Sequence, residues 1–139
     1  MASGTGTYFA AKLLNQIFGG TAYTWTNISQ IDLALYTTGG ITAGGVGTEL
    51  TSGTAPGYVR FGMAQSTTTF PTTATNTISN NVTLTPFSAT GTWVVATTLA
   101  MYEHGNSNLL FFGDLAASKT LSNGDQFQFT VGNLSITQS

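Results

Sequence analysis

The sequence predicts an all-β protein, an antiparallel β-sandwich of jelly-roll type that carries one short N-terminal α-helix. A helical period of apolar residues occurs near the N-terminus, and after residue 20 the period falls to two, as in strands. Clusters of glycine, asparagine and serine then separate about seven or eight short segments, which is typical of sandwiches and barrels. The length of 139 residues fits one domain, 1–139, with the helix within residues 5–18 and the sandwich in residues 30–139.

The helix is expected over residues 8–18. Its apolar side chains recur every four residues in two adjacent rows, Phe9, Leu13 and Ile17 and then Ala10, Leu14 and Phe18. Thr5 or Thr7 is a candidate N-cap, and the glycine pair at 19–20 stops the helix. A helix of about 11 residues is marginal alone, so it must dock. Two readings remain open: it packs on its own sandwich, or its apolar row docks on a neighbouring subunit.

The first half of the predicted sandwich mixes strands with long connections. Residues 31–36 alternate apolar and other side chains, which predicts a half-buried strand. Residues 38–57 are rich in glycine, so we expect a long loop that crosses the surface. The segments that follow are an alternating strand at 59–63, a threonine-rich connection at 66–77 and a polar strand at 78–84 that Pro86 ends.

The second half contains the clearest strand, residues 93–103. Strict alternation would place Trp93, Thr97 and Leu99 on one face of it and Tyr102 on the other. The remaining segments are a turn at 104–108, a returning strand at 109–115, a turn at 122–125 centred on Asn-Gly, and closing strands at 126–131 and 134–137. In the first closing strand Phe127 and Phe129 are expected to point inward. Residues 93–115 therefore predict a β-hairpin.

Charged residues are unusually scarce: Lys and Arg total three, and Asp and Glu total five. Three cations cannot neutralise a run of phosphates, so no nucleic-acid partner is expected. The sequence has neither a basic amphipathic stretch nor a long apolar span, so no membrane partner is expected either. Cysteine is absent, which excludes disulfides and thiolate metal sites and fits assembly in a reducing cytoplasm.

Groups for catalysis are equally sparse, and we predict no enzyme activity, no catalytic residue, no metal site and no cofactor. The single histidine, His104, follows Glu103 in a turn, where we expect it to be exposed to solvent. A serine relay needs a nucleophile held against the imidazole, and no serine lies in a nucleophile-elbow pattern. The carboxylates are scattered along the chain, which favours neither a metal site nor a glycosidase pair.

Five segments occur in an order and at a spacing that resemble a known family. They are LLNQIFGGTAYT (13–24), LALYTT (33–38), GTELTSGTAPGYVR (47–60), LLFFGDLAASKTLSNGDQF (109–127) and GNLSIT (132–137). The family is that of small tailed-bacteriophage virion proteins usually called phage tail-fibre proteins. The resemblance implies a non-enzymatic virion component built on a β-sandwich, assembled in the host cytoplasm. A compact domain of this length also fits a capsid decoration, or cement, protein, and by analogy with such proteins a trimer.

The leading hypothesis is a structural protein of a tailed-bacteriophage particle, either a decoration protein or a tail-fibre component. It would act by self-association and by packing on capsid or tail subunits, since a nearly uncharged surface suits repeated contacts with identical neighbours. The candidate interface residues belong to the helix row and the glycine-rich loop: Phe9, Leu13, Ile17, Gly39, Gly40, Gly44, Gly45 and Gly47.

The alternative hypothesis is a host-receptor or glycan-binding tip module of a tail fibre. Such sites stack sugar rings on exposed aromatic side chains. The candidates are Tyr23, Trp25, Tyr36, Tyr58 and Tyr102.

Overall fold

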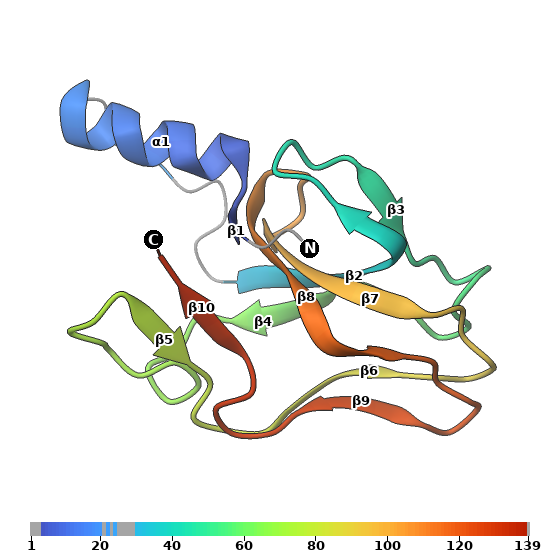
Figure 1. Cartoon of the computed structure of the whole chain (residues 1–139). Coiled ribbons are helices and arrows are strands. Elements are labelled where there is room, and N and C mark those ends of the chain that lie inside the picture. Colours follow the sequence, from blue (N-terminus) through green and yellow to red (C-terminus); the bar gives the residue numbers. More distant parts are fainter. Residues whose placement is uncertain (1–3, 21, 23, 25–29, 139) are drawn as a thin grey trace.

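The computed structural model describes residues 4–20, 22, 24 and 30–138. These residues form one helix and ten strands (Figure 1). The elements are β1 (Gly4–Thr5), α1 (Thr7–Phe18), β2 (Gln30–Ile41), β3 (Gly47–Glu49), β4 (Phe61–Ala64), β5 (Thr77–Ser79), β6 (Leu84–Ser88), β7 (Ala96–Glu103), β8 (Leu109–Lys119), β9 (Gln126–Phe129) and β10 (Ser135–Thr137). The predicted all-β class with a short N-terminal helix is confirmed.

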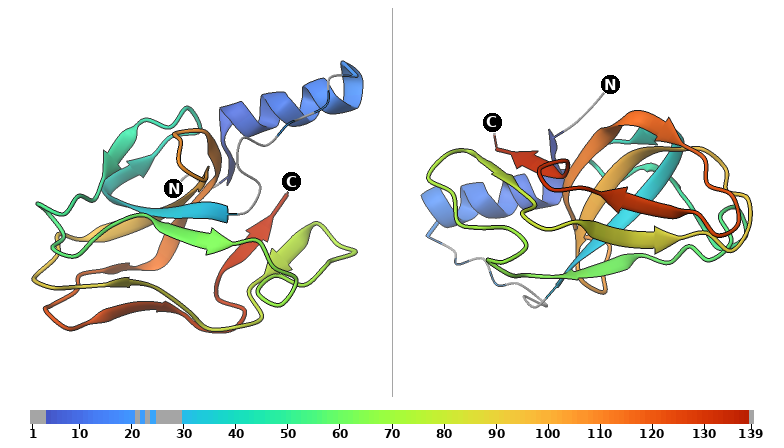
Figure 2. Two further views of the ribbon diagram at one scale, coloured as in Figure 1. Left: turned by 180° about the vertical axis from the view of Figure 1, so that it is seen from behind. Right: turned by 90° about the horizontal axis from the view of Figure 1, so that it is seen from below.

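The strands form one large antiparallel sheet and two ribbons. The large sheet has the order β1-β8-β7-β2-β3, and β4 also pairs with β2. The ribbons are β6–β9 and β5–β10. The β6–β9 ribbon lies opposite the large sheet (Figure 2), and the main apolar core fills the space between these layers. The antiparallel sandwich is therefore confirmed, while jelly-roll connectivity stays a prediction.

Strand β2 lies at the centre of the large sheet and is buried on both faces, so the expected half-buried strand is wrong. Leu33 and Leu35 point into the main core. Ala34 and Tyr36 belong to a second apolar cluster on the opposite face, which also contains Ile41 from the far end of the same strand. Because β2 runs on to Ile41, its own end helps to form the cluster that shields the second face.

The glycine-rich segment is a β-hairpin for half its length, which corrects the expected loop at 38–57. Gly39 and Gly40 have φ values of +97° and +64°, so they bend β2 without ending it. A short turn follows, closed by the hydrogen bond from Thr42 N to Val46 O (2.9 Å). Strand β3 then returns so closely that a Cβ atom on Gly47 would lie 2.3 Å from the Gly40 carbonyl oxygen. The segment is therefore folded on itself and does not extend over the surface.

A tyrosine fills the gap between β3 and β4 along the edge of β2. The Leu35 carbonyl accepts a hydrogen bond from Leu50 N (2.9 Å), and the Leu35 amide donates to the Tyr58 hydroxyl (3.0 Å). The strand expected at 59–63 therefore starts only at Phe61, because the chain first turns the Tyr58 side chain inward.

The strand expected at 78–84 is also corrected, because the chain turns at Asn80. The Asn80 amide is buried; it donates to Val82 O (2.8 Å) and Thr130 O (3.0 Å) and accepts from Leu134 N (2.8 Å). Strand β6 then continues through Pro86 and does not end there. Its register with β9 shifts between Leu84 and Phe87, and such irregular positions tolerate a residue without an N–H.

Strand β7 carries a second irregularity that breaks strict alternation. Its register with β8 shifts between Ala96 and Thr98, so Ala96 joins Trp93 and Leu99 in the main core. The Thr97 hydroxyl instead donates to the Thr37 carbonyl (2.9 Å). The β7–β8 hairpin is present as predicted, but β7 starts at Ala96 and not at residue 93, and β8 runs on to Lys119, past the expected end at residue 115. The turns at 104–108 and 122–125 and the inward direction of Phe127 on β9 are as predicted.

Candidate interaction surface

Helix α1 is attached to the sandwich through the residues just before and at its start. The Gly6 amide donates to Leu110 O (2.7 Å), and the Thr7 amide donates to Ala43 O in the β2–β3 turn (2.8 Å). Gly6 is the N-cap residue, so neither predicted threonine cap is used. A Cβ atom at Gly6 would lie 2.2 Å from the Leu109 carbonyl oxygen. Close backbone contact thus requires glycine here and sets where the helix begins.

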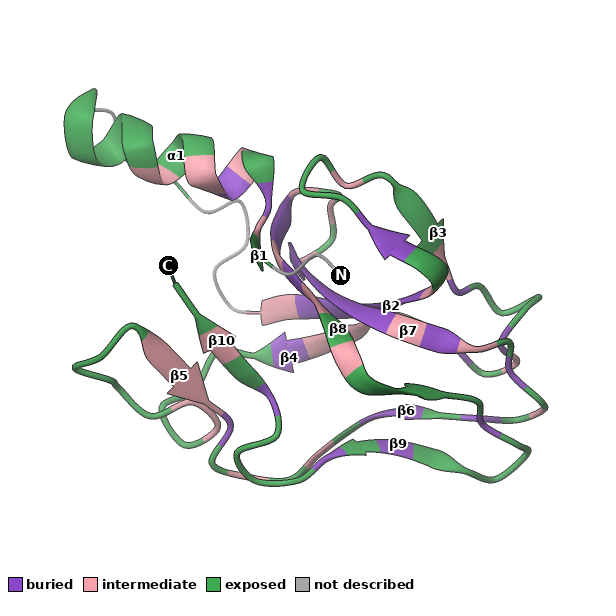
Figure 3. Cartoon of the chain, in the orientation of Figure 1, coloured by how far each residue is buried: buried purple, intermediate pink, exposed green. Residues whose placement is uncertain are grey.

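The helix packs on the sheet near its start and then leaves it. The Phe9 ring meets the Phe111 ring of β8 edge-on, with 5.2 Å between centroids. Leu13 is half-buried, and the exposed fraction then rises to 68% at Ile17 and 80% at Phe18. Figures 1 and 3 show this outer half of the helix projecting away from the sheets. Packing on its own sandwich is therefore confirmed for the first turns, and docking on a neighbour stays a prediction.

The outer half of α1 presents three large apolar side chains, Leu14, Ile17 and Phe18. We call this set the helix patch. Lys12, the only charged residue of the helix, has its ammonium 5.5 Å from the centre of the Tyr8 ring. Contiguous exposed apolar groups of this size usually mark an interaction site.

The structure brings the predicted glycine-loop candidates next to the start of the helix. Thr7 bonds to the turn that follows β2, and this turn contains Gly44 and Gly45. Gly44 is exposed, Gly45 is half-buried, and Val46 beside them is 72% exposed. Residue-type reasoning missed Val46, because a single valine in a glycine-rich segment has no periodic signal.

The other glycine candidates lie along the hairpin and divide by burial. Gly39 and Gly47 are exposed, whereas Gly40 is buried. Gly40 therefore serves the hairpin itself through its positive φ and its contact with β3.

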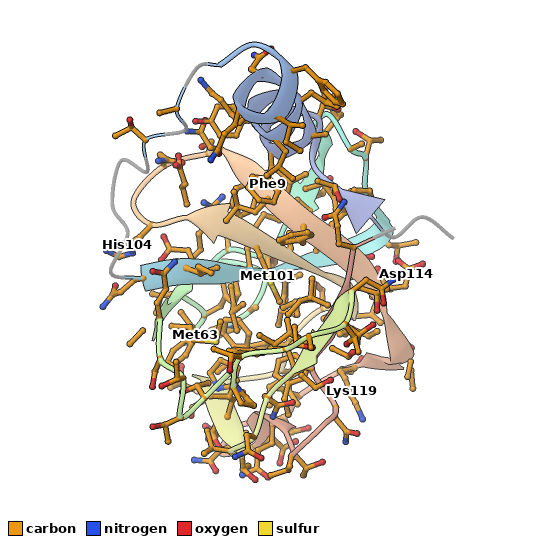
Figure 4. All side chains as sticks on the ribbon, turned by 90° about the vertical axis from the view of Figure 1, so that its left-hand side faces the viewer. Phe9, Met63, Met101, His104, Asp114 and Lys119 are labelled. Atoms are coloured by element: carbon orange, nitrogen blue, oxygen red, sulfur yellow. The ribbon has the colours of Figure 1, made fainter. Side chains whose placement is uncertain are left out.

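An apolar hollow of about 630 Å³ opens at the end of the sandwich from which α1 projects. Its apolar lining comes from β2, β4, β5, β7, β8, β10 and one connection: Ile31, Met63, Phe70, Ile78, Met101, Phe111 and Ile136. Figure 4 views this end of the molecule, with Phe9 above Met101 and Met63 below it. Because so many separate strands contribute, no local sequence pattern indicates the hollow.

The tyrosines proposed for sugar stacking are inside the protein. Tyr36, Tyr58 and Tyr102 are 4%, 5% and 2% exposed. The Tyr36 and Tyr102 hydroxyls are 2.5 Å apart, and the Tyr58 hydroxyl donates to Glu49 Oε1 (2.9 Å). Burial raises the pKa of all three hydroxyls above the usual value. A sugar ring has no access to these faces, and Tyr23 and Trp25 lie outside the described residues.

Arg60 and Glu49 form a bidentate ion pair beside these tyrosines. Arg60 Nε donates to Glu49 Oε1 (2.9 Å) and Nη2 donates to Oε2 (2.7 Å). The guanidinium carbon lies 4.2 Å from the centre of the Tyr102 ring, and Nη1 donates to Asn106 O (3.1 Å). The hydrogen bonds that Arg60 donates to Glu49 raise the pKa of Arg60 further above its usual value. This pair joins β3, the approach to β4, β7 and the 104–108 turn.

A histidine–aspartate contact holds the same turn against β2. His104 Nδ1 and Asp32 Oδ1 are 2.5 Å apart, and Gly105 N donates to Asp32 Oδ2 (2.9 Å). The His104 side chain is about one-third exposed, so the histidine expected to be exposed to solvent is only partly so. Buried Glu103 accepts hydrogen bonds from the Asn108 amide (2.6 Å) and the Asn106 amide (3.1 Å). These contacts order a turn, and residue spacing could not show that Asp32 reaches it.

Within the described ranges, no group of three or more His, Asp or Glu side chains is placed to hold a metal ion. The described part of the chain also contains no helix long and apolar enough to cross a bilayer.

The β-sandwich uses Arg60, Glu49 and Asp32 in internal contacts and presents apolar side chains on a projecting helix, as a structural assembly protein does. A protein-family model described as Podophage GP4 fiber I protein gp80 matches residues 4–137. The chain belongs to this family and is a bacteriophage fibre structural protein, a component of the virion that associates with other virion proteins. The predicted resemblance to phage tail-fibre proteins is thereby confirmed. A comparison with curated proteins found no match.

Proposed function

We propose that this fibre protein acts by packing and not by catalysis: it self-associates as a trimer and attaches to tail subunits of the particle. The observation that carries the proposal is the helix patch, where Leu14, Ile17 and Phe18 are 56%, 68% and 80% exposed. Family membership favours a tail-fibre role over a capsid cement role. The absence of cysteine supports assembly in the reducing cytoplasm of the host cell.

The helix patch is costly unless something covers it. Burying apolar surface is worth roughly 25 cal/mol per Å², so three large side chains are a strong reason to associate. The helix already has a fixed start, because the amides of Gly6 and Thr7 bond to the sandwich. A helix whose start is fixed in this way has less orientational freedom to lose when a partner binds it.

The charged groups support a non-enzymatic role. Arg60 pairs with Glu49 and His104 pairs with Asp32. Asp114 accepts a hydrogen bond from the Thr98 hydroxyl (2.8 Å). These side chains are occupied by contacts that connect strands, and the chain's three cations are too few for nucleic acid.

The test is the oligomeric state of the purified protein and of a patch variant, Leu14→Ser/Ile17→Ser/Phe18→Ser, by sedimentation equilibrium. We expect a trimer for the wild type and a monomer for the variant, with the same β-sheet circular dichroism. Val131→Ser is the matched control, since Val131 is also exposed (58%) but follows β9. A wild-type monomer that is absent from assembled particles would contradict the proposal.

A further inference from the structure

We propose that the apolar hollow at the open end of the sandwich receives the helix patch of a second copy of this chain. The inference rests on the proposed self-association and names the two surfaces that carry it. Each copy carries both the helix patch and this hollow, so every copy can act as donor and as acceptor. Such head-to-tail contacts close into a ring when the rotation allows it, and a trimer is a ring of this kind.

The hollow selects for an uncharged, apolar occupant. Its wall is formed by side chains such as Phe70, Ile78 and Ile136. The polar residues of its lining are neutral and come from one connection, β5 and the chain end: Gln65, Ser66, Thr67, Thr73, Thr75, Asn76, Thr77 and Gln138. With no charged group in the lining, a charged ligand would lose its hydration without gaining a partner.

The helix patch meets these requirements. Lys12 is the only charged residue in α1, and it precedes the patch and lies near the Tyr8 ring. Leu14, Ile17 and Phe18 span little more than one helical turn, so one helix end presents all three within a short length. Seating them in the hollow buries apolar surface and leaves no charge in an apolar environment.

The size of the hollow suits a helix end. Its volume of about 630 Å³ falls within the roughly 300–1,000 Å³ of pockets that enclose a drug-sized ligand. At roughly 150–200 Å² for a large side chain, the patch offers about 350 Å² of exposed surface. Counting both surfaces, one contact between a helix patch and a hollow buries about 700 Å², below the roughly 1,200 Å² of a stable interface. A single contact of this size is too weak for a stable dimer. A closed ring is therefore required, because in a ring every copy makes two such contacts, one through its patch and one through its hollow.

The hollow cannot be filled by the patch of its own chain. Phe111 lines the hollow and also packs against Phe9 in the first turns of α1. The helix therefore starts beside the hollow and extends for a length of about 18 Å above β5 and β10, to the same side of the molecule (Figure 1). Turning its far end back would break the backbone bonds at Gly6 and Thr7.

The test uses the cysteine-free chain to trap the contact. Full-length Phe18→Cys protein is mixed with full-length Gln65→Cys protein under oxidised glutathione, since Gln65 is exposed and lines the hollow. We expect the mixed disulfide dimer to form at least tenfold faster than with Ser122→Cys, whose cysteine lies in the exposed turn before β9. Sedimentation of the wild type should show monomer and trimer without a populated dimer.

Three outcomes would overturn the inference. Equal rates of cross-linking of Phe18→Cys to the Gln65→Cys and Ser122→Cys proteins, with an oligomeric wild type, would show that the patch does not enter the hollow. The proposed self-association would then still stand. A fast intramolecular disulfide in a Phe18→Cys/Gln65→Cys double variant would assign the hollow to the chain's own helix. A wild type that is monomeric at all concentrations would remove the inference and the self-association together.

Discussion

The centre of the large sheet and the outer half of helix α1 are both rich in apolar residues, yet they have opposite environments. Leu33 and Leu35 on β2 have no exposed surface, whereas Ile17 and Phe18 are largely exposed. Strand β2 pairs with β7 along one edge and with β3 and β4 along the other. Helix α1 is buried at Phe9 and partly buried at Leu13, and its residues from Leu14 to Phe18 are exposed. Periodicity therefore identifies residues that avoid water, but it does not identify what covers them.

The largest expected effect comes from a matched pair of truncations in the two regions. Leu35→Ala should lower the free energy of unfolding by about 3 kcal/mol, because the side chain is fully buried and its removal leaves a cavity. Ile17→Ala should change it by less than about 0.5 kcal/mol in the monomer. Urea unfolding at low protein concentration measures both. Similar losses in the two variants would show that the helix is covered within one chain.

A second substitution breaks the junction between the two regions. Gly6→Ala should cost about 2 kcal/mol, because its Cβ atom would overlap the Leu109 carbonyl and the helix start must shift. Hydrogen exchange should show lost protection at the Thr7 amide and little change in β7. Gly4→Ala is the control, since no atom lies within 4 Å of the added Cβ. An unaffected Thr7 amide would mean that the helix start does not depend on this contact.

High pH should destabilise the large sheet through its buried tyrosines and leave the exposed outer half of α1 unaffected. Burial raises the pKa of Tyr36 and Tyr58, so these hydroxyls stay protonated in the folded state when the unfolded chain ionises near pH 10. The contribution of these protonated hydroxyls to the free energy of unfolding is complete below pH 10. It is lost as the pH rises above 10, by about 1.4 kcal/mol per pH unit for each tyrosine. Urea midpoints between pH 8 and pH 11 measure this slope, and Tyr36→Phe should make it shallower. A flat profile would contradict the burial of these rings.

Some local features could be predicted from sequence because neighbouring residues determine them. The four-residue spacing of Phe9 and Leu13 predicted the helix, and the Asn-Gly pair predicted the turn before β9, where Gly124 has a φ of +90°. Phe127 and Phe129 predicted the inward face of β9. The irregular positions were missed, since the turn at Asn80 depends on backbone groups more than 45 residues away.

For the candidate interaction surface too, single elements could be predicted from sequence, but the contacts between them could not. The helix was predicted, whereas the glycine-rich segment was expected to be one long loop and the turn at 42–46 within it was missed. The contact of this turn with the helix, through Thr7 and Ala43, joins residues that are far apart in sequence. The three described tyrosine candidates were chosen for residue type, and only the packed fold shows that their faces are covered.

By itself, the sequence determined the strand-rich class, the single N-terminal helix, most turns and the resemblance to phage fibre proteins, because short-range periodicity and turn chemistry encode them. The tertiary structure alone decided which apolar residues are covered. It assembled the hollow from six strands and left Leu14, Ile17 and Phe18 beyond the edge of the sheet. Burial is a property of which segments meet in space, and that information is absent from any local stretch of the chain.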